Sequence, residues 1–201
     1  MSTLTALIHR YQTSQSLADE DQIYRELRQY AAQERPKFLQ EFRSIPIDES
    51  SPAHWIYEAL SEDSETWQQF FSEEFDRVVA AVASSPDPMR ILPLLSQFYL
   101  FGQDVVTSLR LVLRKKIRLG LTHASPAVRR GCAALMVDFV DAKDMDELMA
   151  LAQMAQSDED WQARYTAFLS LEEVWPSKAE KVKLPLWIRT KGRLANLGTM
   201  A

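Results

Sequence analysis

The sequence contains few of the residues from which catalytic and metal sites are usually built. Only one of its 201 residues is cysteine, three are histidine and five are glycine. The glycines stand apart from one another, so the chain has no glycine-rich loop to hold a phosphate. His9, His54 and His123 are far apart, and none has a second histidine or cysteine at the spacing of metal ligands. We therefore expect a non-enzymatic protein with no catalytic residue, cofactor or metal.

The chain also lacks long apolar segments and paired cysteines. No apolar run approaches the roughly 18 residues that a membrane span needs, and no basic, apolar leader opens the sequence. Cys132 has no partner for an internal disulfide, and its apolar neighbours Ala133, Ala134 and Leu135 indicate a buried, unreactive thiol. These absences predict a soluble cytoplasmic protein that makes no use of a membrane.

The residues that are abundant favour helices. Runs of β-branched residues are scarce, whereas Leu, Ala, Gln, Glu and Arg are frequent. With 46% hydrophobic and 25% charged residues, the composition is that of an ordinary globular protein. A chain of 201 residues is long enough for one domain with a substantial core or for one short solenoid. We predict an all-α fold in a single helical-repeat domain.

Four helix starts recur at a nearly constant interval. Ser51-Pro52, Asp87-Pro88 and Ser125-Pro126 each place a capping residue before a proline, which is favoured at the first helical position. A fourth start, Asp160-Trp161, lacks the proline. The starts lie 36, 38 and 35 residues apart, a period typical of stacked helical hairpins. The spacing predicts a right-handed α–α superhelix, a short solenoid of about four to five hairpins.

The apolar periodicity sets the expected elements. We expect N-terminal helices in residues 1–50, repeat units in 51–174, and a C-terminal capping helix with a basic tail in 175–201. Pro93 should interrupt the helical segment 88–101. The predicted helices cover residues 3–14, 20–33, 36–44, 52–62, 65–83, 88–101, 104–119, 126–140, 143–156, 160–174 and 185–196. Apolar stripes that predict core positions are Trp67, Phe70, Phe71, Phe75, Val78, Val79 and Val82; Val105, Leu109, Val112 and Leu113; Val128, Cys132, Leu135, Met136 and Phe139; and Met145, Leu148, Met149 and Ala152.

Two of the predicted helices resemble one another and a known repeat. The later one carries Asp158, Ala163, Arg164, Ala167 and Leu171, and the earlier one carries Val128, Arg129, Cys132 and Met136 at equivalent places, offset by 35 residues. This pattern resembles that of HEAT repeats. The resemblance covers about residues 104–174, with a weaker continuation back to residue 36. It implies a ladder of Asp–Arg contacts between turns, in which Asp158 and Arg164 are expected to take part, whereas His123 stands where the earlier unit's Asp belongs.

Charge is distributed in blocks along the chain. Residues 1–104 and 132–175 are acidic, with balances of −9 and −8, whereas 105–131 and 176–201 are basic, with +7 and +5. The candidate partner-binding residues in the first basic block are Arg110, Arg114, Lys115, Arg118, Arg129 and Arg130. Arg110, Arg114 and Arg118 share one helix face, where they are able to bind phosphates or carboxylates. The alternative is a solvated face that pairs with acidic residues of neighbouring helices.

An aromatic stripe is the second candidate for partner binding. Trp161, Tyr165 and Phe168 lie on the helix face opposite Ala163, Ala167 and Leu171, and a helix that is apolar on two faces is normally covered on both. Leu186, Trp187 and Leu194 of the C-terminal segment are the expected cover. The alternative is an exposed aromatic binding surface.

Two functions are compatible with this pattern. The first is a non-catalytic HEAT-like module that binds a protein partner as an adaptor, assembly factor or immunity-type inhibitor; this is favoured by the repeats and by the missing catalytic constellation. The alternative is a nucleic-acid-binding protein such as a HEAT-like DNA glycosylase. The basic block favours it, whereas the sequence pI of about 5.3 disfavours it.

Overall fold

Helices are the only regular structure in the part of the chain that the structure describes. The structure is a computed structural model that describes residues 3–48, 50–102, 108–141 and 143–199. The α-helices are α1 (Leu4–Thr13), α2 (Leu17–Gln33), α3 (Arg35–Arg43), α4 (Ala53–Ser61), α5 (Gln68–Ser84), α6 (Leu92–Ser96), α7 (Ser108–Gly120), α8 (Pro126–Phe139), α9 (Met145–Ser157), α10 (Trp161–Val174), α11 (Pro176–Ala179) and α12 (Leu186–Thr199). The all-α prediction is confirmed.

Proline and capping residues fix where several helices begin. Pro126 and Trp161 are the first residues of α8 and α10, as predicted. The carboxylate of Asp160 accepts a hydrogen bond from the backbone N–H of Ala163 at 2.8 Å, which caps α10. The Ser125 side chain makes no such bond, so α8 starts with proline alone.

The predicted helix over residues 88–101 is broken into three short pieces. Two 3₁₀ helices, η1 (Pro88–Arg90) and η2 (Gln97–Phe101), flank α6. Pro93 lies in the first turn of α6, where its missing N–H is tolerated. The interruption at Pro93 is confirmed. The predicted start of the next helix at residue 104, and the core position assigned to Val105, lie outside the described residues.

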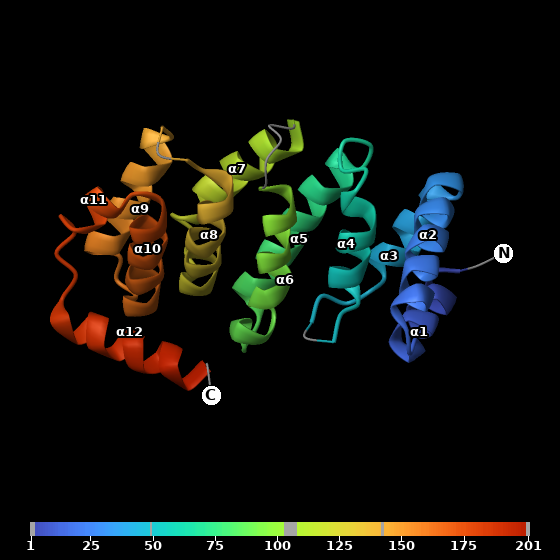
Figure 1. Ribbon diagram of the computed structural model, residues 1–201, viewed down its shortest axis with the longest axis horizontal. Helices are drawn as coiled ribbons and strands as arrows, with labels where there is room; N and C mark the ends of the chain where they lie inside the picture. The colour runs from blue at the N-terminus through green and yellow to red at the C-terminus, as the bar shows by residue number, and fades with distance from the viewer. Residues whose placement is uncertain (1–2, 49, 103–107, 142, 200–201) are drawn as a thin grey trace.

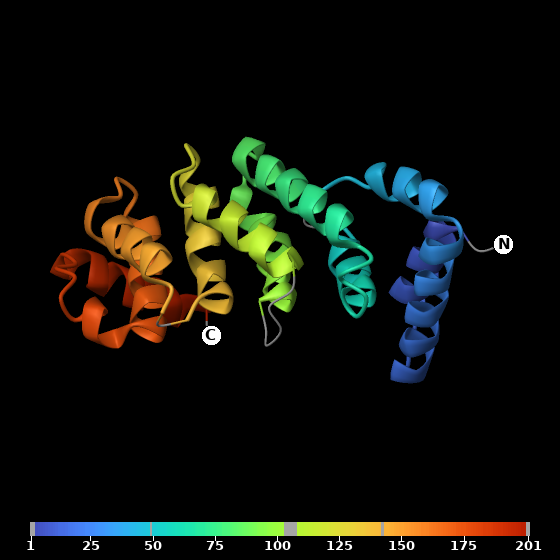
Figure 2. The same ribbon diagram turned by 90° about the horizontal axis from the view of Figure 1, so that it is seen from above.

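The helices are arranged in two rows along the long axis of the molecule. In Figure 1, α4, α6, α8 and α10 lie side by side, with α1 and α2 at one end and α12 at the other. Figure 2 shows α5, α7 and α9 as a second row on one side of the first. Neighbours within and between the rows pack directly, with α8 against α6, α7 and α10, and α9 against α10. The helices that begin near Pro52, Pro88, Pro126 and Trp161 thus occupy successive places in one row.

The core changes character along this row. Its N-terminal half is filled by aromatic rings, with the Phe70 centroid 5.1 Å from that of Phe42 and 5.2 Å from that of Phe71. The C-terminal half is packed mainly with aliphatic and small residues, including the fully buried Ala163 and Ala167 of α10. The stripe predicted for α8 is buried throughout, whereas the one predicted for α9 is wrong in part. Met145 and Met149 are 46% and 47% exposed.

Candidate partner-binding surface at the C-terminal end

A buried ion pair joins α8 to the start of α10. The guanidinium of Arg129 donates two hydrogen bonds to the Asp158 carboxylate, from Nε at 2.7 Å and from Nη2 at 2.8 Å. Its Nη1 donates to the backbone carbonyls of His123 and Ala124 at 2.8 and 3.0 Å. The two charged side chains are only 9% and 7% exposed. Arg129 is thus part of the scaffold, which corrects its assignment as a partner-binding residue.

The same pair corrects the Asp–Arg contact expected from the sequence. Asp158 bonds to Arg129, which lies in the preceding hairpin, and not to Arg164. The Nε of Arg164 donates instead to the Ala155 carbonyl at 3.3 Å, at the end of α9. The contact therefore joins α8 to the turn between α9 and α10, and the arginine that bonds to Asp158 lies 29 residues earlier in the chain, not six residues later.

Acidic residues of α9 face the basic row on α7. Arg114 donates to Glu147 at 3.0 Å and to Asp144 at 2.6 Å. Arg118 lies 3.6 Å from Asp146 and is half exposed. Burial raises the pKa of Glu147, but the hydrogen bonds from Arg114 outweigh it and hold the pKa below the usual value. Much of the positive charge predicted to attract a polyanion is therefore compensated within the protein.

The remaining basic candidates have different surroundings. Arg110 is partly buried on α7, and Lys115 is exposed beside it. Arg130, on α8, is turned toward α10 and η1, where its Nη2 contacts the sulfur of Met89. No carboxylate of the described residues lies within ion-pair distance of Arg130. Burial lowers the pKa of this guanidinium, and the negative charge of Asp160, beyond ion-pair distance, opposes that effect in part.

Helix α12 covers the aromatic stripe of α10. Trp161, Tyr165 and Phe168 are partly buried beneath it. The ammonium of Lys191 lies 4.3 Å from the Trp161 ring centroid, and the guanidinium carbon of Arg189 lies 5.2 Å from that of Phe168. Cations above aromatic faces are attracted by the ring quadrupole. The expectation that the C-terminal segment covers this stripe is correct.

The residues expected to form the cover point the other way. Leu186, Trp187 and Leu194 are 79%, 57% and 65% exposed. Ile188 and Gly192, four residues apart, face α10 instead, and a side chain at Gly192 would come within 2.4 Å of the Tyr165 ring. Because Gly192 has no side chain, the backbone of α12 is able to approach the Tyr165 ring on this face of the helix. Helix α12 thus packs on α10 through Ile188, Gly192 and the cations of Arg189 and Lys191, and it presents Leu186, Trp187 and Leu194 to solvent.

A small cavity lies where α12 leaves α10. It has a volume of about 220 Å³ and is lined by side chains of η1, α8, α10 and α12. Three of the predicted partner-binding residues, Arg130, Trp161 and Tyr165, meet in its wall. In the sequence, Arg130 belongs to the basic block, whereas Trp161 and Tyr165 belong to the aromatic stripe. The cavity joins them because α8 and α10 are neighbours in the same row.

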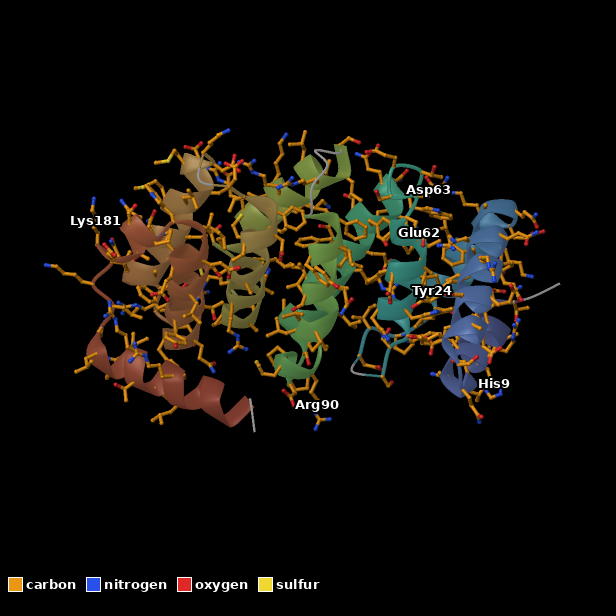
Figure 3. All side chains as sticks on the ribbon, viewed as in Figure 1. His9, Tyr24, Glu62, Asp63, Arg90 and Lys181 are labelled. Carbon is orange, nitrogen blue, oxygen red and sulfur yellow. The ribbon has the colours of Figure 1, made fainter. Side chains whose placement is uncertain are left out.

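Within the described ranges, no group of three or more His, Cys, Asp or Glu side chains is placed to hold a metal. His9 lies near the N-terminal end and Lys181 at the opposite end (Figure 3). Burial raises the pKa of the Cys132 thiol to about 12, which keeps it protonated. No helix among the described residues is long and apolar enough to cross a membrane.

Comparison with protein-family models, with curated proteins and with solved structures finds no match to this chain.

Proposed function

We propose that this protein is a non-catalytic interaction module, a short right-handed α–α superhelix of HEAT-like hairpins that binds a protein partner through the outer face of α12. We define this face by Leu186, Trp187 and Leu194. Their exposure is the observation that carries the proposal. Trp187 and Leu194 lie seven residues apart and so share one side of the helix. Exposed tryptophan beside large aliphatic residues is typical of the anchors that dominate protein interfaces.

Charge around this face indicates the chemistry of the partner. Lys183 and Arg193 are exposed next to the apolar residues, and residues 176–201 carry a balance of +5. The complementary surface has apolar side chains flanked by Asp and Glu. An acidic amphipathic helix has this composition and is able to lie along α12.

The proposal is tested by changing the outer face without changing the fold. We expect Trp187→Ser/Leu194→Ser to keep the melting temperature of the wild type, because both side chains are exposed. Affinity capture from the native host, followed by calorimetry with the purified partner, should show binding weakened at least about tenfold. Leu17→Ser is the matched control, since Leu17 is 80% exposed on α2 at the other end of the chain. Equal loss in both variants, or no loss in the α12 variant, contradicts the assignment of the binding face.

Nucleic-acid binding through the basic block is the alternative. The carboxylates that contact Arg114, Arg118 and Arg129 favour the protein-binding proposal over it. We expect no binding of duplex or single-stranded DNA at about 150 mM salt. A duplex affinity tighter than about 1 μM that falls steeply with salt would reverse this choice.

A further inference from the structure

The cavity beside α12 is open to solvent and combines a guanidinium with aromatic and polar side chains. Arg130 lines it together with Trp161, Tyr165 and Thr166, and no Asp or Glu is among its lining residues. The neighbouring arginines Arg114, Arg118 and Arg129 all contact carboxylates of this chain. Arg130 therefore differs from these three arginines: it lines a cavity, and the charge of Asp160 acts on it only from beyond ion-pair distance.

The polar groups in the wall are available to a ligand. Within the described ranges, the Thr166 hydroxyl and the Gln162 amide make no side-chain hydrogen bond, and both face the cavity. Lys191, which is not in the wall, places a second positive charge 4.3 Å from the ring centroid of Trp161, which is. A guanidinium presents a planar fork that fits a carboxylate, and hydroxyl and amide donors complete such a site. The ring of Trp161 offers an apolar wall for the carbon atoms next to the carboxylate.

We infer that this cavity binds a carboxylate, and that its source is an acidic side chain of the protein partner. The volume of about 220 Å³ is below the range of roughly 300–1,000 Å³ found for sites that enclose small-molecule ligands, so it suits one inserted side chain. This inference rests on the proposed function and deepens it, because Arg130 then selects partners with Asp or Glu beside their apolar residues. The positive charge around α12 also indicates an acidic partner, in agreement with a carboxylate site.

The test uses two small probes and needs no partner. N-acetylglutamate α-amide carries one carboxylate, and N-acetylglutamine α-amide is its neutral counterpart. Titration of each into the ¹⁵N-labelled full chain is followed at the indole N–H of Trp161, which is assigned with Trp161→Phe. We expect the glutamate probe alone to shift this signal, with a millimolar dissociation constant. Arg130→Gln should weaken its binding at least about tenfold. Arg25→Gln, an exposed site on α2, is the matched control and should bind as the wild type does.

Each outcome of the titration decides the assignment. No shift, equal shifts with both probes, or unchanged binding in Arg130→Gln would overturn the carboxylate site. The melting curve of Arg130→Gln should match that of the wild type, because no ion pair is lost. If it does not, Arg130→Lys is compared instead, and it should bind the glutamate probe more weakly than the wild type but more tightly than Arg130→Gln. A third probe, indole-3-acetate, separates the sources: affinity more than about 100-fold above that of the glutamate probe would make this a small-molecule site and overturn the partner side chain. Trp187→Ser/Leu194→Ser should leave probe binding intact, so failure of the outer face and failure of the cavity give different results.

Discussion

Removing the Arg129 side chain should destabilise the protein more than any other change in the basic block. Arg129→Ala leaves the Asp158 carboxylate, which is 7% exposed, without its bidentate partner. It also removes the hydrogen bonds to two part-buried carbonyls, those of His123 and Ala124. Breaking one side of a buried ion pair costs about 3–5 kcal/mol, because the remaining charge is stranded. We therefore expect the free energy of unfolding to fall by about that amount, which lowers the melting temperature of a chain this size by roughly 10 °C.

Two comparison variants make this prediction specific to the pair. Arg164→Ala removes one hydrogen bond of 3.3 Å to the Ala155 carbonyl and should cost only about 0.5–1.5 kcal/mol. The double variant Arg129→Leu/Asp158→Leu leaves no stranded charge and should cost less than Arg129→Ala alone. The assay is urea unfolding followed by circular dichroism. If Arg164→Ala proves as costly as Arg129→Ala, the contact between units has been assigned to the wrong arginine.

Three further predictions concern pH, packing and reactivity. Burial raises the pKa of Glu74, although the Tyr57 hydroxyl donates a hydrogen bond to its carboxylate at 3.0 Å. The folded state therefore keeps the Glu74 proton to higher pH than the unfolded chain does, and the stability gained from protonated Glu74 is lost as the pH rises above about 4.5. In urea titrations Glu74→Gln should accordingly gain stability relative to the wild type between pH 4.5 and 7, and a difference that stays constant over this range would show that Glu74 does not titrate there. Gly192→Val should push the Tyr165 ring away and loosen α12, which limited trypsin digestion would detect as faster C-terminal cleavage; unchanged digestion would show that the contact yields without cost. Cys132, whose thiol pKa is raised to about 12 by burial, should react with a thiol reagent only after denaturant is added, and rapid labelling of the native protein would contradict its burial.

Local features of the fold were predictable from sequence because they depend on neighbours in the chain. Pro126 begins α8, Pro93 interrupts the segment after α5, and the α8 stripe is buried, all from spacing and backbone chemistry. The exposure of Met145 and Met149 was not predictable, because periodicity reports an apolar side of a helix but not whether another helix lies over it.

The site was predictable in its members but not in its arrangement. The prediction that the C-terminal segment covers Trp161 and Tyr165 is correct. Which face of α12 turns inward could not be predicted, because it depends on the distance between Gly192 and the Tyr165 ring of another helix. The partner of Asp158 likewise depends on packing between helices, since the sequence offers an arginine both in α8, at Arg129, and in α10, at Arg164. Arg130 was grouped with its neighbours by charge, and only the packing of α8 against η1 and α10 separates it from them.

The two kinds of core differ in the space that they leave for a larger side chain. Aromatic rings fill the N-terminal half, with the Phe70 centroid 5.1 Å from that of Phe42 and 5.2 Å from that of Phe71. At Gly131 an added methyl group would lie 2.7 Å from Leu95, whose flexible side chain is able to move aside. The buried Ala163 and Ala167 of α10 carry no side-chain atom beyond Cβ, so a larger residue at either position has to displace the elements packed on this helix. Substitutions at these two alanines are therefore expected to shift whole helices of the C-terminal end.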